Sequence, residues 1–204
     1  MKMEEMIAAV QSVLGVAVDG RAGPQTWGAI YQRIVIPTMA ATSQAPGIAA
    51  VDPRSEQVIA TLLPDVQPMA RALVQKAALA GIRIKIISGF RTYEEQDALY
   101  AQGRTAPGAI VTNARAGYSN HNFGIAFDVG VFEGNQYLGE SPKYKAVGAL
   151  GMDLGLEWGG NWKTIVDQPH FQLRPTWATV TGMSEKEMLA ELRNRVADGR
   201  PVYA

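Results

Sequence analysis

The hydrophobic pattern at the start of the chain has the spacing of short helices. Apolar residues recur every three or four positions up to Gly15, which predicts one helix carrying Ile7, Val10, Val13 and Leu14. A second helix is expected to begin at Pro24, because proline at the first helical position loses no donor that the helix needs. Its apolar face would consist of Trp27, Ile30, Tyr31 and Ile34.

The pattern then changes twice. Residues 37–53, PTMAATSQAPGIAAVDP, show no periodicity and are rich in Ala, Pro, Ser and Thr, which is typical of a linker. Beyond them, helical and strand patterns alternate. The sequence therefore predicts a helical module over residues 1–36, a linker over 37–53 and a main domain over 54–204.

The main domain mixes helices with short strands. Helices are expected over residues 55–63, 65–80, 93–102, 141–152 and after Ser184, the last one bearing Met188, Leu189, Leu192 and Val196. Strands are expected over residues 82–88, 123–132, 156–160 and 170–173. Residues 130–139 have the composition of an exposed hairpin loop that would shape a groove. Strands interleaved irregularly with helices predict an α+β fold.

Charge and composition exclude several classes of protein. The 19 basic and 19 acidic residues cancel, so no overall charge attracts nucleic acid or anionic lipid. The chain has no cysteine, which excludes disulfides and thiolate metal sites and leaves only nitrogen and oxygen ligands. It begins without a basic, apolar export signal and has no membrane-spanning stretch. We therefore expect synthesis in the cytoplasm and no insertion into a membrane.

Both histidines of the chain stand near a carboxylate at the edge of a predicted strand. His121 precedes Asp128 by seven residues, and Asp167 precedes His170 by three. Taken singly, each is more often a hydrogen-bonded core residue than a ligand. Together, His121, Asp128 and His170 would give a zinc site with an open position for water, which zinc acidifies to a pKa of about 7. Asp167 is then left over to act as a base.

Three motifs carry a resemblance to a known family. They are S-x-H-x-x-G-x-A-x-D over Ser119–Asp128, D-x-x-H over Asp167–His170, and SGFRT over Ser88–Thr92. In this order they resemble the zinc D-Ala-D-Ala metallopeptidase superfamily, across roughly residues 54–175. That superfamily contains D,D-carboxypeptidases, dipeptidases of the vancomycin-resistance type and L-alanyl-D-glutamate endopeptidases of phage lysis enzymes. It implies a small antiparallel sheet flanked by helices.

The resemblance also implies roles for individual residues. It makes His121, Asp128 and His170 the ligands of Zn²⁺, Asp167 the general base, and Arg91 the residue that steadies the substrate carbonyl. Ser119 would line the site. For Arg91 the alternative is a capping or salt-bridge arginine, and for Ser119 a turn-forming serine. Trp158 is a candidate for the cleft, with the core as its alternative.

A second resemblance concerns the N-terminal module. Two short helices around DGRAGPQTW are similar to the small three-helix peptidoglycan-binding module of cell-wall hydrolases; the alternative is a helical hairpin packed on the main domain. The leading hypothesis is an endolysin-like enzyme that cuts bacterial peptidoglycan between L-Ala and D-Glu, is released by a holin, and works as a monomer. The alternatives are a D,D- or L,D-carboxypeptidase and a non-catalytic wall-binding protein.

Overall fold

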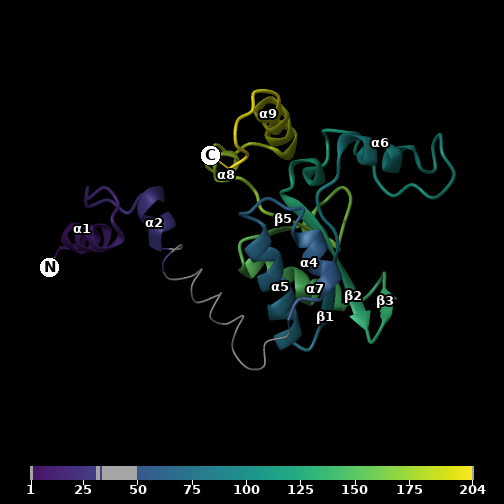
Figure 1. The fold of residues 1–204 in the computed structure, drawn as a ribbon, viewed down its shortest axis with the longest axis horizontal. Helices are drawn as coiled ribbons and strands as arrows, with labels where there is room; N and C mark the ends of the chain where they lie inside the picture. The colour runs from purple at the N-terminus through teal and green to yellow at the C-terminus, as the bar shows by residue number, and fades with distance from the viewer. Residues whose placement is uncertain (1, 31–32, 34–49, 204) are drawn as a thin grey trace. The chain divides into compact units, whose positions relative to one another are not determined.

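A computed structural model describes residues 2–30, 33 and 50–203 of the chain. Contacts within it divide the chain into two compact units, Met1–Ile48 and Ala49–Ala204 (Figure 1). Most of the predicted linker over residues 37–53 lies outside the described residues, as do Tyr31 and Ile34 of the expected apolar face. None of the helices in the described part is both long and apolar enough to cross a membrane.

The first unit contains α1 (Met3–Leu14) and α2 (Pro24–Ile30), close to the predicted helices. Helix α1 ends at Gly15, whose φ of 71° is the left-handed conformation that glycine adopts without steric cost. The amide of Gln11, which is buried, makes five hydrogen bonds, to Asp19, Gly20 and Arg21 in the loop between the helices and to Thr26 in the first turn of α2. Trp27 is 59% exposed, so the unit does not bury it as part of an apolar face.

The second unit is α+β, which confirms the predicted class. All strand pairings are antiparallel, and the sheet has the order β1-β2-β5-β4 with β3 paired to β2. The strands are β1 (Arg83–Ser88), β2 (Ala126–Glu133), β3 (Gln136–Leu138), β4 (Glu157–Trp158) and β5 (His170–Gln172). Strand β2 is central because it pairs with three others.

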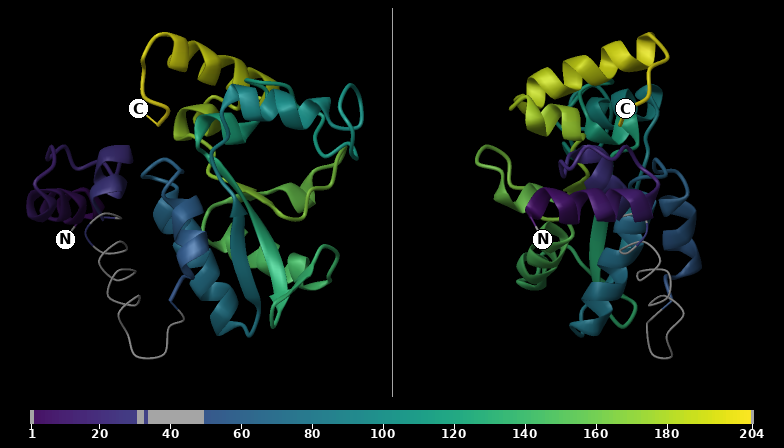
Figure 2. Two further views of the ribbon diagram at one scale, coloured as in Figure 1. Left: turned by 45° about the vertical axis from the view of Figure 1, so that its right-hand side comes forward. Right: turned by 90° about the vertical axis from the view of Figure 1, so that its left-hand side faces the viewer.

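Helices surround this sheet. They are α4 (Pro53–Ile59), α5 (Gln67–Leu79), α6 (Tyr93–Ala101), α7 (Lys143–Asp153), α8 (Thr176–Val180) and α9 (Glu185–Ala197). Helices α4 and α5 pack against β1, and α7 packs against α5 and β4. Helices α6, α8 and α9 lie at one end of the unit, and the β2–β3 hairpin lies at the other (Figures 1 and 2). Strand β2 thus runs from the α6–α9 end towards the hairpin.

Close packing of α7 on the sheet depends on two glycines. A Cβ on Gly148 would come within 2.4 Å of the Trp158 ring, and one on Gly151 within 2.4 Å of the Phe171 ring. Both aromatic rings are buried, so the helix can approach β4 and β5 only where it lacks side chains. This contact fixes β4 and its neighbour β5, the strand that carries His170.

A separate apolar cluster attaches the C-terminal helices. It contains Phe123, Ile125, Ala178, Met188, Leu189 and Leu192, all buried. Ser184 and Glu187 form the capping box that begins α9, as the sequence predicts. Val196, however, is 52% exposed, so the expected apolar face of α9 does not extend to its last turn. Helix α8 was not predicted, since five residues are too few to show a helical period.

The predicted strand over residues 123–132 begins too early. Residues Asn120–Phe123 form a single 3₁₀ turn, η2, which ends at Gly124 with a φ of 67°. Strand β2 therefore starts at Ala126, and Gly124 does not share a strand face with Asp128. The left-handed glycine turns the chain sharply between His121 and the strand, which a straight strand could not do.

Candidate metal centre

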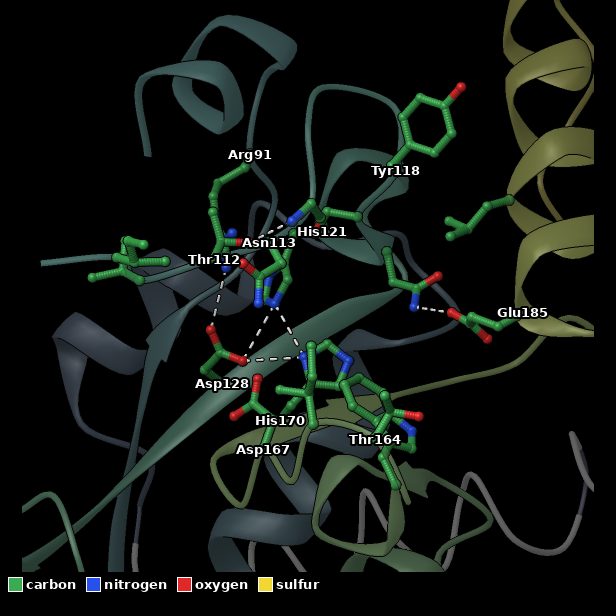
Figure 3. Close-up of a pocket in the computed structure, with 18 of the residues that line it drawn as sticks. Arg91, Thr112, Asn113, Tyr118, His121, Asp128, Thr164, Asp167, His170 and Glu185 are labelled. Carbon is green, nitrogen blue, oxygen red and sulfur yellow. Dashed lines mark hydrogen bonds and ion pairs between the residues drawn. The ribbon is translucent and has the colours of Figure 1, made fainter. Parts of the chain in front are cut away.

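Three ligand atoms meet at the start of β2. Asp128 lies directly opposite His170 in the antiparallel pairing of β2 with β5, and η2 holds His121 just before the same strand. Nε2 of His121, Nδ1 of His170 and Oδ1 of Asp128 lie 3.3 Å from one another in all three pairs. Figure 3 shows the three side chains converging on one point. We call these residues the three-ligand site.

The spacing of the three-ligand site fits a tetrahedral metal ion. Bonds of about 2.0–2.1 Å, typical of zinc with nitrogen and oxygen, place neighbouring ligands of a tetrahedron about 3.3–3.4 Å apart. The three atoms have the spacing of one face of such a tetrahedron, and each belongs to a side chain that can bind a metal ion. Two imidazoles and a carboxylate also match the donor types that zinc accepts, with the fourth position left for water.

Hydrogen bonding directs the His121 ring towards the site. Its Nδ1 lies 2.7 Å from the backbone carbonyl of Gly89, which can only accept. Nδ1 therefore carries the proton, and Nε2 presents its lone pair to the three-ligand site. The backbone amide of Arg91 donates to the carbonyl of His121 at 3.1 Å, so the SGFRT segment and η2 brace each other.

The carboxyl of Asp128 is held ionised by its surroundings. Burial by itself raises the pKa of Asp128, but the two imidazoles outweigh that effect and keep the pKa well below its ordinary value. Arg91 adds a further positive charge, with Nη2 at 3.3 Å from Oδ2. An ionised Asp128 is the form that binds a cation.

Arg91 lies in the site, not at the surface of α6. Its Nη1 donates to Oε1 of Gln96 at 2.8 Å, and its Nη2 contacts Ser88 as well as Asp128. The cap of α6 is instead made by Thr92 and Glu95. The capping alternative for Arg91 therefore does not describe this arginine, whereas the salt bridge does form, with Asp128.

Asp167 lines the same cavity, beside the three-ligand site (Figure 3). Its pKa is raised, first because it is buried and then because Asp128 is negatively charged nearby. Its loop is held close by Gly159, where a Cβ would lie 2.5 Å from the Asp167 carbonyl. A carboxyl whose pKa is raised in this way is suited to accept and return a proton.

The cavity has a volume of about 710 Å³. Two loops, over residues 110–114 and 162–165, contribute to its lining. So do Arg91, Ser119, His121, Asp128, Asp167 and His170. The structure thus brings together every predicted site residue except Trp158. The hairpin over residues 130–139 does not line this cavity, so the expectation that it shapes the groove is wrong.

Trp158 belongs to the core. It is 7% exposed, its ring lies over Gly148, and its Nε1 donates to the carbonyl of Gln168. Tyr118 and Trp162 line the cavity instead. The ring of Trp162 lies 4.8 Å from that of His170. Sequence reasoning missed it, although its position eight residues before His170 in the same segment was a usable signal.

Comparison with known proteins decides the family. Over 126 residues, the chain is 43% identical to the peptidoglycan L-alanyl-D-glutamate endopeptidase CwlK of Bacillus subtilis, covering 56% of this chain and 74% of that protein. The chain belongs to the zinc D-Ala-D-Ala metallopeptidase family. Residues 60–159 also match the VanY family, described as D-alanyl-D-alanine carboxypeptidase. The resemblance seen in the three motifs is therefore confirmed, as is the expectation of a metallopeptidase.

Two further proteins are similar to this chain at lower identity. The L-alanyl-D-glutamate peptidase of Listeria phage A118 is 30% identical over 122 residues, covering 58% of this chain and 40% of that protein. Among solved structures, the L-Ala D-Glu endopeptidase ChiX of Serratia marcescens has 24% identity and a TM-score of 0.48, covering 64% of this chain and 93% of that one.

Proposed function

We propose that this chain is a zinc-dependent peptidoglycan hydrolase that cuts the stem peptide between L-Ala and D-Glu. The observation that carries the proposal is the three-ligand site, with its equal spacings of 3.3 Å, next to Asp167 and Arg91 in one cavity. The bond is suggested by the relatives, because CwlK and the phage A118 peptidase are both named for L-alanyl-D-glutamate cleavage.

His121, Asp128 and His170 would hold the zinc ion. When bound, zinc would supply a Lewis acid and lower the pKa of water in its open position. Asp167 would take a proton from the attacking water and return it to the amine that leaves. Its raised pKa makes it a stronger base, and a better acceptor of that proton, than an exposed aspartate would be. Arg91 would donate to the substrate oxygen as negative charge develops there.

The products of digestion test this proposal. Purified peptidoglycan treated with the zinc-loaded protein should give fragments with a new L-Ala carboxyl end and a new D-Glu amino end by mass spectrometry. Asp167→Asn should give neither fragment while still binding zinc. Release of terminal D-Ala without those ends would favour the carboxypeptidase alternative, to which the description of the VanY match also points.

We also propose that the first unit binds the cell wall. The support is its pair of helices around the loop that precedes α2, organised by the buried amide of Gln11. A wall-binding unit tethered to the peptidase would raise the local concentration of substrate. Synthesis in the cytoplasm, a monomeric state and release by a holin stay predictions.

A further inference from the structure

The side chain of Gln172, on β5, is fully buried behind His170. Its Oε1 lies 2.9 Å from Nε2 of His170. On its other side, Nε2 of Gln172 lies 2.7 Å from Oε2 of Glu157 and 3.5 Å from Oε2 of Glu185. This glutamine therefore stands between an imidazole and two carboxylates.

The two carboxylates determine which way the amide of Gln172 points. An ionised carboxylate can only accept hydrogen bonds, so the group that faces Glu157 must be the NH₂ group. Asn120 adds to this, since its Nδ2 donates to Oε1 of Gln172 at 2.6 Å. Rotating the amide by half a turn would set its oxygen against Glu157 and its NH₂ group against the NH₂ group of Asn120. One orientation therefore satisfies every contact.

This orientation fixes the tautomer of His170. The oxygen that faces Nε2 of His170 is an acceptor, so Nε2 carries the proton of the neutral ring. Nδ1 then has the lone pair, and it is Nδ1 that lies 3.3 Å from both His121 and Asp128. The opposite tautomer would turn an N–H group towards the cation and leave Nε2 and Oε1 of Gln172 as two facing acceptors.

We propose that Gln172 is a positioning residue of the metal centre, which holds His170 in the tautomer and ring orientation that bind the cation. Glu157 acts through it, because the β4–β5 register places Glu157 opposite Gln172. Arg174 keeps the carboxylates in place, with Nη1 at 3.1 Å from Glu185 and 3.7 Å from Glu157. The inference depends on the proposed zinc site, and it adds the group that prepares one of the ligands.

Gln172→Met tests the role of the acceptor, because methionine has a similar length and lacks the carbonyl oxygen. Loss of such an outer contact typically weakens metal binding by about 10–100-fold. We expect that loss in the zinc dissociation constant of the full chain, measured by competition with a chelator. In the metal-free protein, ¹⁵N spectra of the neutral imidazole should show the Nε2–H tautomer for the wild type and a mixture for Gln172→Met.

The matched control is Gln67→Met. It removes a half-buried glutamine that donates to the carbonyl of Leu62 at the start of α5, outside the cavity. It should leave both readouts unchanged. Equal zinc affinity and an equal tautomer in Gln172→Met and the wild type would overturn the role of Gln172. A wild type that binds no zinc would reject the metal centre, and the ¹⁵N spectra would still decide the tautomer.

A charge exchange supplies a second test that does not depend on how well Gln172→Met folds. Gln172→Glu keeps the acceptor but sets a carboxylate against Glu157, so zinc affinity should fall. Adding Glu157→Gln restores a donor facing an acceptor, and affinity should return to within about threefold of the wild type. Failure of the double variant to recover, when it is folded by circular dichroism, would contradict the proposal.

Discussion

Arg91 and Asp128, 37 positions apart, form an ion pair of 3.3 Å within the cavity. The guanidinium of Arg91 also contacts Gln96 and Ser88, so together with Asp128 three contacts fix it in one orientation. A lysine could not replace this planar arrangement of donors. The proposed metal ligand Asp128 and the proposed oxyanion donor Arg91 are thus positioned together, so a change at Arg91 should affect catalysis.

Arg91→Ala should lower kcat by about 10²–10³, the usual effect of removing one donor from an oxyanion site, while zinc stays bound. Arg91→Lys should recover only part of the rate. Activity on a soluble muropeptide and zinc content measure the two effects. The matched control is Arg71→Lys, which alters a three-bond contact with Glu56 outside the cavity. Loss of zinc together with loss of rate would place Arg91 in metal binding.

Asp167→Asn should inactivate the enzyme and stabilise the metal-free protein at neutral pH. Activity should fall by about 10²–10⁴, as for removal of a general base. The raised pKa of Asp167 means that the folded protein holds this proton more tightly than the unfolded chain does. Stability of the wild type therefore falls as pH rises above the ordinary value of 3.8, and asparagine avoids that loss.

Urea unfolding of the metal-free proteins measures this difference. The advantage of Asp167→Asn should be present at about pH 7 and should shrink as the pH falls towards the ordinary carboxyl pKa, where both states of the wild type are protonated. An advantage that persists unchanged into acid would show that the gain comes from packing and not from the charge of Asp167.

The two tryptophans of the segment EWGGNW should behave differently. Trp158→Ala removes a ring packed on α7 and should cost about 3–5 kcal/mol of stability. Trp162→Ala should change stability much less, because this side chain is 36% exposed, and should reduce kcat/KM because it lines the cavity beside His170. Chemical unfolding and kinetics on one muropeptide substrate separate the two. If Trp158→Ala were as stable as the wild type and had a raised KM, Trp158 would be a residue of the cleft and not of the core.

These tryptophans show where sequence reasoning ends. The residues of the three-ligand site could be predicted to lie together because His121 and Asp128 are close in sequence and His170 follows in the family's motif order. The burial of Trp158 depends on Gly148, a contact made when α7 packs on β4, and no local pattern reveals it. The predicted strand that begins at residue 123 is wrong for a local reason. The stretch is apolar enough for a strand, but a left-handed turn at Gly124 interrupts it, so β2 begins at Ala126.

Alkaline pH should weaken the fold through Tyr144. Its phenol is buried, donates to the carbonyl of Leu138 and accepts from the amide of Val131, and burial raises its pKa from 10.0 to about 12. Between these values the unfolded chain loses the proton and the folded protein keeps it, so stability falls as pH rises. The loss is at most about 1.4 kcal/mol for each pH unit.

Tyr144→Phe supplies the comparison. At about pH 8 it should be less stable than the wild type by about 1–3 kcal/mol, because it leaves buried hydrogen-bonding groups of β2 and β3 without this partner. The difference in stability between the two proteins should be smaller at about pH 11, because the wild type loses stability there and phenylalanine does not titrate. Urea unfolding at the two pH values tests it, and a constant gap would mean that Tyr144 keeps its ordinary pKa.

The last prediction concerns the first unit. Gln11→Leu keeps the size of a buried side chain but removes the five hydrogen bonds that hold the loop before α2 and the first turn of that helix. If this unit binds the wall, activity on whole cell walls should fall towards that of a chain lacking residues 1–36. Activity on soluble muropeptides should not change, because the proposed catalytic residues all lie in the second unit. Ser12→Ala, an exposed change on the same helix, is the matched control. Equal loss on both substrates would mean that the first unit supports the fold of the peptidase instead of its attachment to the wall.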